Sequence, residues 1–552
     1  MSQTTSSPLS LPFIQKIQAC LAGKTSALLY LLVMLLVIGL SLAPIFPWQV
    51  TPASAPPEMF SGERAMAHLP VIAQEAHPSG SPAQARVRDY LVQQLTDLGL
   101  EVEVQQAAGA ENVVARLHGT NPSGAILVQA HYDSYRGPGA GDNGSGVAVL
   151  LEIMRALAAG PVPRNDIIAL FDDSEELPDA FTGTKAFIRS HPWMADVRVA
   201  IGMDTAARGF ICVDDTGSSN GWMVQALARA YTGGAWSSVS GGGNYDTAPF
   251  RQAGIQILEL EDNYPFHEQH TAEDVPELVN PGSVQQLGKQ ALAVVRELSD
   301  ADLSNTSGEQ ETFQYLPFYV GLMHYPEAWA LPLAILAGVL LIVALGLALW
   351  CKAASWRGLA VAALAILMMA GLAAVAVNAF WQAAPDLFHW ETSGWPEWPE
   401  AIPPGGWWIW IVSNALAVVL AVMGYRLVRR WSQPANFAFF GLFIFAVLAV
   451  LLGISTPRAA ILPTWPVLGG AAFWIAAVLA RRARPGSLAS GFVLLAAIPS
   501  LVSILPLLPV VFMSDGTKSV AIIAGVWVIL MGVILPVVDG LVARPADRVK
   551  EV

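Results

Sequence analysis

The sequence has few charged residues and few cysteines for its length. Only 13 % of its 552 residues are charged, whereas 54 % are hydrophobic, which is not the composition of an ordinary soluble chain. The three cysteines, Cys20, Cys212 and Cys351, lie far apart, so the sequence shows no disulfide framework and no CxxC pair of a structural zinc site. Its apolar residues gather in long runs, which is typical of membrane spans.

Charge is distributed unevenly along the chain. Residues 50–320 hold 34 acidic and 15 basic residues, whereas the remainder holds 9 acidic and 15 basic residues. An acidic segment is a poor partner for a phosphate backbone, so we expect no nucleic-acid partner. The pattern predicts an acidic soluble domain, flanked in the sequence by membrane segments that carry a net positive charge.

The amino-terminal region predicts a membrane anchor. Residues 1–26 are polar and carry no acid, which predicts a cytoplasmic tail, and residues 27–47 are apolar enough for one span. The segment Ala53–Ala55 has the small-x-small form of a signal-peptide cleavage site. It lies well beyond the apolar run, so an uncleaved signal anchor is favoured over a cleaved signal peptide.

Residues 59–303 predict one α/β domain. Strand and helix patterns alternate along this segment, and they predict a mostly parallel sheet covered by helices on both faces. Residues 304–328 are expected to form a linker. The expected strands are 101–105, 112–117, 126–129, 166–171, 197–203 and 255–260, and the expected helices are 86–98, 146–158, 184–190, 221–231 and 281–298.

Residues 329–541 predict an all-α membrane domain of seven spans, followed by a cytoplasmic tail at 542–552. Lysine and arginine gather in alternate loops, and the opposite short loops carry only Arg458 and Lys518 as basic residues. The positive-inside rule then gives eight spans in total, with both termini cytoplasmic and the α/β domain periplasmic or extracellular, or lumenal in a eukaryote. We expect no ionisable cluster within the spans. The expected spans are near 329–350, 358–380, 407–425, 436–455, 463–480, 488–512 and 519–541.

Histidine and carboxylates recur where the predicted strands end. A single such residue is typically a turn or cap residue, but several successive strands place one at the edge where open α/β sheets bind ligands. His131 and Asp133 lie two residues apart, so on extended backbone both side chains leave the same face, which suits one ligand and one carboxylate that orients it. The pattern indicates a metal site, and the residues concerned are His131, Asp133, Asp142, Glu175, Glu176, Asp204 and His270.

These motifs resemble those of the M28 family of zinc peptidases, including its multispan membrane branch. The resemblance rests on His131-x-Asp133, GAGDN around Asp142, the Glu175–Glu176 pair, the strand-end Asp204 and His270-Thr271-x-x-Asp274, in the family's order over residues 60–300. It implies a zinc exopeptidase fold with two zinc ions per chain. Asp142 would bridge the ions, with His131 and Asp204 on one ion and Glu176 and His270 on the other. Glu175 would be the general base, and Asp133 would orient His131.

Several positions depart from the family pattern or compete with it. Ser174 stands where the family usually has glycine before the glutamate pair, and Gln269 replaces a frequent aromatic residue. His267 is a rival ligand, although the HTAED motif favours His270. Asp246 falls where the family has an acidic residue near the site.

The sequence therefore predicts a membrane-anchored two-zinc metallopeptidase. It would act on peptide substrates outside the cytoplasm, as an aminopeptidase, with the lipid bilayer as its other partner. One alternative is a single-zinc acyltransferase similar to glutaminyl cyclases, which zinc content per chain would distinguish. Another is an inactive peptidase-like binding module, from which loss of peptide hydrolysis in a Glu175→Gln variant that retains zinc would distinguish an enzyme.

Overall fold

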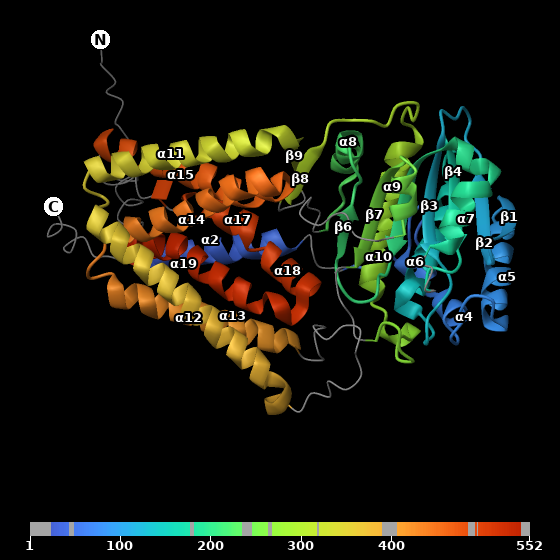
Figure 1. The fold of residues 1–552 in the computed structure, drawn as a ribbon, viewed down its shortest axis with the longest axis horizontal. Coiled ribbons are helices and arrows are strands. Elements are labelled where there is room, and N and C mark those ends of the chain that lie inside the picture. Colours follow the sequence, from blue (N-terminus) through green and yellow to red (C-terminus); the bar gives the residue numbers. More distant parts are fainter. Residues whose placement is uncertain are drawn as a thin grey trace, which may run out of the picture.

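A computed structural model describes residues 24–43, 49–176, 181–234, 246–262, 268–316, 320–388, 406–483, 492–493 and 495–542. An α/β domain and a bundle of apolar helices lie end to end along the long axis, with a two-stranded hairpin at their junction (Figure 1). The expected fold class, an α/β domain followed by a multispan helical domain, is confirmed.

A seven-stranded sheet forms the centre of the α/β domain, in the order β1-β2-β4-β3-β5-β7-β6. The four central strands β4, β3, β5 and β7 are parallel, whereas β1, β2 and β6 pair antiparallel with their neighbours. The sheet is therefore parallel at its centre and antiparallel at both edges. Its strands are β1 Glu101–Ala107, β2 Ala110–Leu117, β3 Ala125–His131, β4 Asp166–Asp172, β5 Val197–Asp204, β6 Ile211–Asp215 and β7 Gln256–Asp262.

Helices cover both faces of this sheet. Alternate apolar residues of the strands point to opposite faces, so one set packs on α5, α6, α8 and α10 and the other on α7 and α9. Ser81 accepts a hydrogen bond from the Gln84 N–H and caps α5, with Pro82 in its first turn. The helices of the domain are α3 Gly62–Met66, α4 Leu69–Ile72, α5 Pro82–Asp97, α6 Ser145–Ala158, α7 Thr182–Ser190, α8 Gly221–Ala230, α9 Ala248–Gln252 and α10 Pro281–Ser299.

The parallel strands end level with one another, and this brings the following loops together. All seven residues of β3 are buried, as a strand covered on both faces requires. The register pairs His131 of β3 with Asp172 of β4, and Gln129 of β3 with Gly202 of β5. The loops after β3, β4 and β5 therefore leave the sheet at one edge.

The segment 304–328, expected to be a linker, contains a hairpin of β8 Glu311–Leu316 and β9 Gly321–Pro326. The hairpin contacts the helical bundle directly. The Thr312 hydroxyl donates to the Arg458 carbonyl at 2.9 Å, and the Gln314 side-chain amide donates to the Ser503 carbonyl at 3.2 Å. This segment therefore joins the α/β domain to the helical bundle through direct hydrogen bonds.

Six helices of the described residues are long and apolar enough to cross a membrane. A further apolar helix, α2 Lys24–Leu42, packs beside α19. The run expected as one span at 488–512 differs: its described part forms two short helices, α17 Ile498–Ile504 and α18 Leu507–Asp515, on either side of Pro506. Proline lacks an N–H donor and crowds the preceding turn, which explains the break. The six long helices are α11 Ala330–Trp350, α12 Trp356–Phe388, α13 Gly406–Val428, α14 Pro434–Ser455, α15 Ile461–Ala483 and α19 Val520–Val542.

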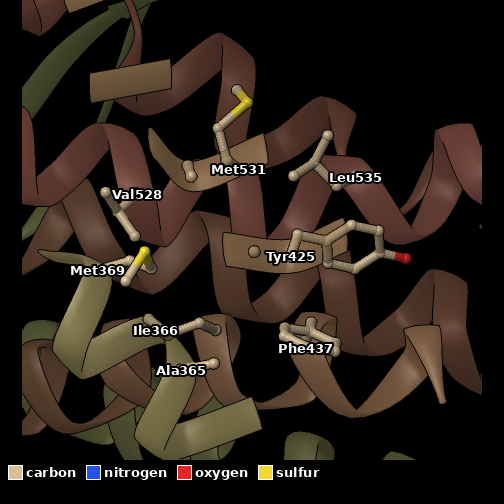
Figure 2. A pocket seen from close by; sticks show the side chains of 10 residues that line it. Ala365, Ile366, Met369, Tyr425, Phe437, Val528, Met531 and Leu535 are labelled. Carbon is tan, nitrogen blue, oxygen red and sulfur yellow. The ribbon is translucent and has the colours of Figure 1, made fainter. Parts of the chain in front are cut away.

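One ion pair lies at the end of the bundle, where a residue of α19 meets a basic residue of the loop after α13. Asp539 of α19 pairs with Arg429 at 2.8 Å and accepts a hydrogen bond from the Tyr425 hydroxyl at 3.0 Å. Beside Tyr425, Met369, Phe437 and Met531 line a small cavity of about 20 Å³ (Figure 2). Such a volume holds about one water molecule, so it is a packing gap and not a ligand site.

Candidate metal centre

Five potential ligands meet at the carboxyl edge of the central strands. His131 ends β3 and Asp204 ends β5, and both are held by the ladder of the sheet. Asp142 lies in the turn Ala140–Gly144 that leads into α6, and Glu176 lies in the loop after β4. His270 lies between β7 and α10. The sheet and its loops therefore bring together residues that are up to 139 positions apart in the sequence.

Asp142 is at the centre of this group. Its Oδ1 lies 3.2 Å from His131 Nε2, and its Oδ2 lies 3.1 Å from His270 Nε2. His131 Nε2 is also 3.9 Å from Asp204 Oδ1, and His270 Nε2 is 3.1 Å from Glu176 Oε1. Each oxygen of Asp142 thus faces a different histidine, and each histidine has a second carboxylate beside it.

The donor set fits zinc. Ligand atoms of His131, Asp142 and Glu176 all lie within 4.8 Å of one another. Imidazole nitrogens and carboxylate oxygens are zinc ligands in catalytic sites, and three carboxylates against two histidines give the site the negative charge that a dication needs.

Asp133 connects the histidine to the glutamate pair. Its Oδ1 accepts the Glu175 N–H at 3.1 Å and its Oδ2 accepts the Glu176 N–H at 3.2 Å. His131 Nδ1 lies 3.2 Å from the Asp133 carbonyl oxygen and 3.7 Å from Asp133 Oδ1. Asp133 therefore fixes the backbone of the glutamate pair as well as lying beside His131.

The protonation of the site follows from burial and from these contacts. Burial raises the pKa of Glu175 to about 8, against the attraction of His131 and with added repulsion from Glu176. Burial would lower the pKa of His270, but hydrogen bonds with Asp142 and Glu176 outweigh it and raise this pKa to about 11. Burial opposes the charge of Asp142, yet hydrogen bonds with His131 and His270 hold its pKa well below the usual range. A carboxyl group with a pKa near neutrality, such as Glu175, can both take and give a proton.

Two residues support Asp142 in ways that the sequence analysis missed. Asp274 accepts the Gly141 N–H at 2.7 Å and the Asp142 N–H at 3.1 Å, and so holds the turn that presents Asp142. Gln269 donates from its side-chain amide to Asp142 Oδ2 at 2.7 Å. Both lie within or beside the HTAED motif, which was the available signal, but their contacts depend on how that loop folds back.

The remaining candidates occupy different places. Asp246 is buried, and burial raises its pKa well above the usual range, against the attraction of His131. Its Oδ2 accepts no hydrogen bond from the described residues. His267, the rival ligand, lies outside the described residues. Ser174 has a φ of +65°, the left-handed conformation that favours glycine.

Comparison with known proteins finds a family match over the segment that holds this site. Residues 112–295 match Peptidase family M28, a range that includes all five candidate ligands. The chain therefore carries a domain of peptidase family M28.

Two curated relatives are similar over this domain. Endoplasmic reticulum metallopeptidase 1 of Rattus norvegicus is 30 % identical over 214 residues, which cover 36 % of this chain and 23 % of the rat protein. The vacuolar membrane protease of Candida dubliniensis is 27 % identical over 273 residues, which cover 45 % of this chain and 29 % of that protein. The matched regions are thus less than a third of the length of either relative.

Among solved structures, a zinc aminopeptidase from Bacillus subtilis superposes with a TM-score of 0.39 at 16 % identity, covering 45 % of this chain and 98 % of that protein. The six apolar helices and the similarity to a vacuolar membrane protease identify this chain as an integral membrane protein.

Proposed function

We propose that this protein is a membrane-anchored metallopeptidase that binds two zinc ions and removes amino-terminal residues from peptides. The observation that carries the proposal is the position of Asp142, whose two oxygens face two different histidines. A carboxylate in this position can be shared by two ions, and a shared anion offsets the repulsion between them.

The five candidate ligands would be distributed over the two ions. Asp142 would be common to both, with His131 and Asp204 on one ion and Glu176 and His270 on the other. Bound zinc polarises a carbonyl group and lowers the pKa of a coordinated water molecule.

Glu175 would act as the general base and then as the general acid. It would take a proton from the attacking water and pass it to the leaving amine, for which a raised pKa is well suited. Asp133 would keep Glu175 in place through its hydrogen bond to the Glu175 N–H. The peptide bond would then break between the acyl carbon and the amine nitrogen.

The proposal includes eight membrane spans, with both termini cytoplasmic and the peptidase domain on the other side. The six long helices, α2 and the broken segment 498–515 give eight apolar segments. Loops with many basic residues meet at one end of the bundle, where the Gln433 side chain donates to the Lys352 carbonyl and Arg429 pairs with Asp539. Arg458, at the other end, contacts the hairpin β8–β9 at the junction with the peptidase domain. The positive-inside rule makes the first end cytoplasmic.

The test combines zinc content with hydrolysis of aminoacyl reporter substrates by the purified full-length protein. We expect two zinc ions per chain and chelator-sensitive release of the reporter, with no release from the same reporter carrying an acetylated amino terminus. Glu175→Gln should retain zinc and lose roughly 10²- to 10⁴-fold in kcat, because a general base supplies a factor of this size. Glu277→Gln, at an exposed position, is the matched control and should be fully active.

Other outcomes would point elsewhere. One zinc ion per chain with cyclisation of an amino-terminal glutamine would favour the cyclase-like alternative. Undiminished hydrolysis by Glu175→Gln would contradict the role of Glu175. A protein without zinc and without turnover would contradict the proposal as a whole.

A further inference from the structure

We propose that Ser79 is a positioning residue that holds the turn before the glutamate pair, and thereby aims Glu175 and Glu176 at the metal centre. This inference rests on the proposed function for its catalytic part, but its metal-binding part can be tested separately. Ser79 lies between α4 and α5, 95 residues before its partner Ser174.

The turn needs an external support because of its backbone conformation. Ser174 directly precedes the glutamate pair, is 1 % exposed and has a φ of +65°. A side chain with a Cβ is disfavoured there, whereas glycine adopts this conformation freely. A serine at this position therefore tends to leave the left-handed region unless its surroundings hold it.

Two contacts hold Ser174, one through its side chain and one through its backbone. The hydroxyl groups of Ser79 and Ser174 are hydrogen-bonded at 2.8 Å, and the Ser174 carbonyl accepts the Thr182 N–H at 3.4 Å. Immediately after the turn, Asp133 accepts the N–H groups of both glutamates. The Ser79 hydroxyl is the only one of these partners that binds the Ser174 side chain among the described residues.

The Ser79 segment is itself fixed to the loop after β3. The His77 N–H donates to the Ser134 hydroxyl at 2.9 Å, and the Ser134 N–H donates to the His77 carbonyl at 3.3 Å. The Gly80 N–H donates to Gln84 of α5 at 2.9 Å. Residues 77–80 thus join the loop that carries Asp133 to the loop that carries the glutamates, and they set the relative position of these two loops.

Loss of the Ser79 hydroxyl should let the Ser174 backbone relax and turn the glutamate side chains away from the centre. Glu176 is a proposed ligand, so the zinc affinity should fall. Glu175 is the proposed base, so kcat should fall while KM changes little. Removal of a residue that orients a ligand typically lowers metal affinity or activity by roughly 10- to 100-fold.

The experiment compares five variants of the full-length protein: Ser79→Ala, Ser174→Ala, Ser174→Gly, the double variant Ser79→Ala/Ser174→Gly, and the exposed control Ser304→Ala. Zinc affinity is measured by competition with a chelator, and kcat and KM are measured on the aminoacyl reporter. Ser79→Ala and Ser174→Ala should each lose about tenfold in zinc affinity and in kcat. Ser174→Gly should remain within about twofold of the natural protein, because glycine needs no support at this φ.

The double variant distinguishes a positioning role of Ser79 from a general structural role. In the Ser174→Gly background, Ser79→Ala should have no further effect, whereas a merely structural role of Ser79 would lower both readouts again. Wild-type zinc affinity in Ser79→Ala, or a loss in Ser174→Gly as large as in Ser174→Ala, would overturn the inference. If the natural protein binds zinc but hydrolyses no peptide, the proposed function fails, and the zinc affinities still test the role of Ser79. Thermal midpoints show that each variant is folded.

Discussion

Histidines and carboxylates of the candidate metal centre lie within hydrogen-bond distance of one another, and these contacts shift their pKa values. Hydrogen bonds with carboxylates outweigh burial and raise the pKa of His131 and His270. Burial also raises the pKa of Glu176 to about 7. Zinc binds the deprotonated forms of these groups, so zinc binding must release protons.

The zinc affinity of the metal-free protein should therefore rise with pH between pH 6 and pH 8. Groups with a raised pKa hold their protons at the lower pH, and zinc has to displace them, so the affinity falls as the pH falls. Each proton released gives roughly a tenfold change in affinity per pH unit. Chelator competition at pH 6, 7 and 8, corrected for the chelator's own protonation, measures the slope. An affinity independent of pH would contradict this protonation scheme.

At the level of single residues, the candidate ligands could be predicted from the sequence. The residues that hold these ligands in place through hydrogen bonds could not. His131 and Asp204 stand at strand ends, where periodicity and the α/β edge rule locate them. The hydrogen bond that Asp274 accepts from the Gly141 N–H and the one that Gln269 donates to Asp142 both cross from one loop to another. No local pattern encodes such contacts, because they depend on the path of a loop of irregular structure.

At the level of elements, the spacing of hydrophobic residues along the sequence predicted the buried strands and the amphipathic helices. It missed β6 Ile211–Asp215 and the hairpin β8–β9, which are short and contain polar residues such as Asp214, Asp215 and Gln314. These strands owe their conformation to their pairing partners and to the bundle, which is long-range information. It also predicted no break within 488–512, because the apolar run outweighed the helix-breaking effect of Pro506.

Helix α10 packs through a glycine on the segment that leads into α3, and this close approach can be tested. A Cβ at Gly288 would lie 1.9 Å from Phe60 Cζ, and Phe60 is itself buried. We expect Gly288→Ala to lower the free energy of unfolding by about 1–3 kcal/mol, the usual cost of overpacking, despite the better helix propensity of alanine.

Thermal unfolding of the detergent-solubilised protein measures this change. Phe60→Leu in the Gly288→Ala background is the matched control, because a smaller side chain makes room for the new methyl group. It should recover part of the loss. A Gly288→Ala variant at least as stable as the natural protein would show that α10 can move away from residue 60 at no cost.

At the level of the whole molecule, the hairpin and the bundle fix which end of the helices lies beside the peptidase domain (Figure 1). Apolar residues of the two parts also join: Phe210, Cys212 and Tyr315 belong to the same buried cluster as the bundle. The peptidase domain is thus seated on one end of the bundle. In the proposed topology that end is the non-cytoplasmic one, and Cys351, directly after α11, lies at the opposite end.

Cysteine labelling tests this topology directly, because the chain has only three cysteines. One variant keeps Cys351 alone, with Cys20→Ser and Cys212→Ala. The matched variant also carries Cys351→Ser and has a new cysteine at the exposed Ser307, between α10 and β8. A membrane-impermeant maleimide added to intact spheroplasts should label Ser307→Cys, whereas Cys351 should react only after the membrane is permeabilised. Labelling of Cys351 from outside, with protection of Ser307→Cys, would reverse the orientation and place the metal centre in the cytoplasm, where it would meet a different set of peptides.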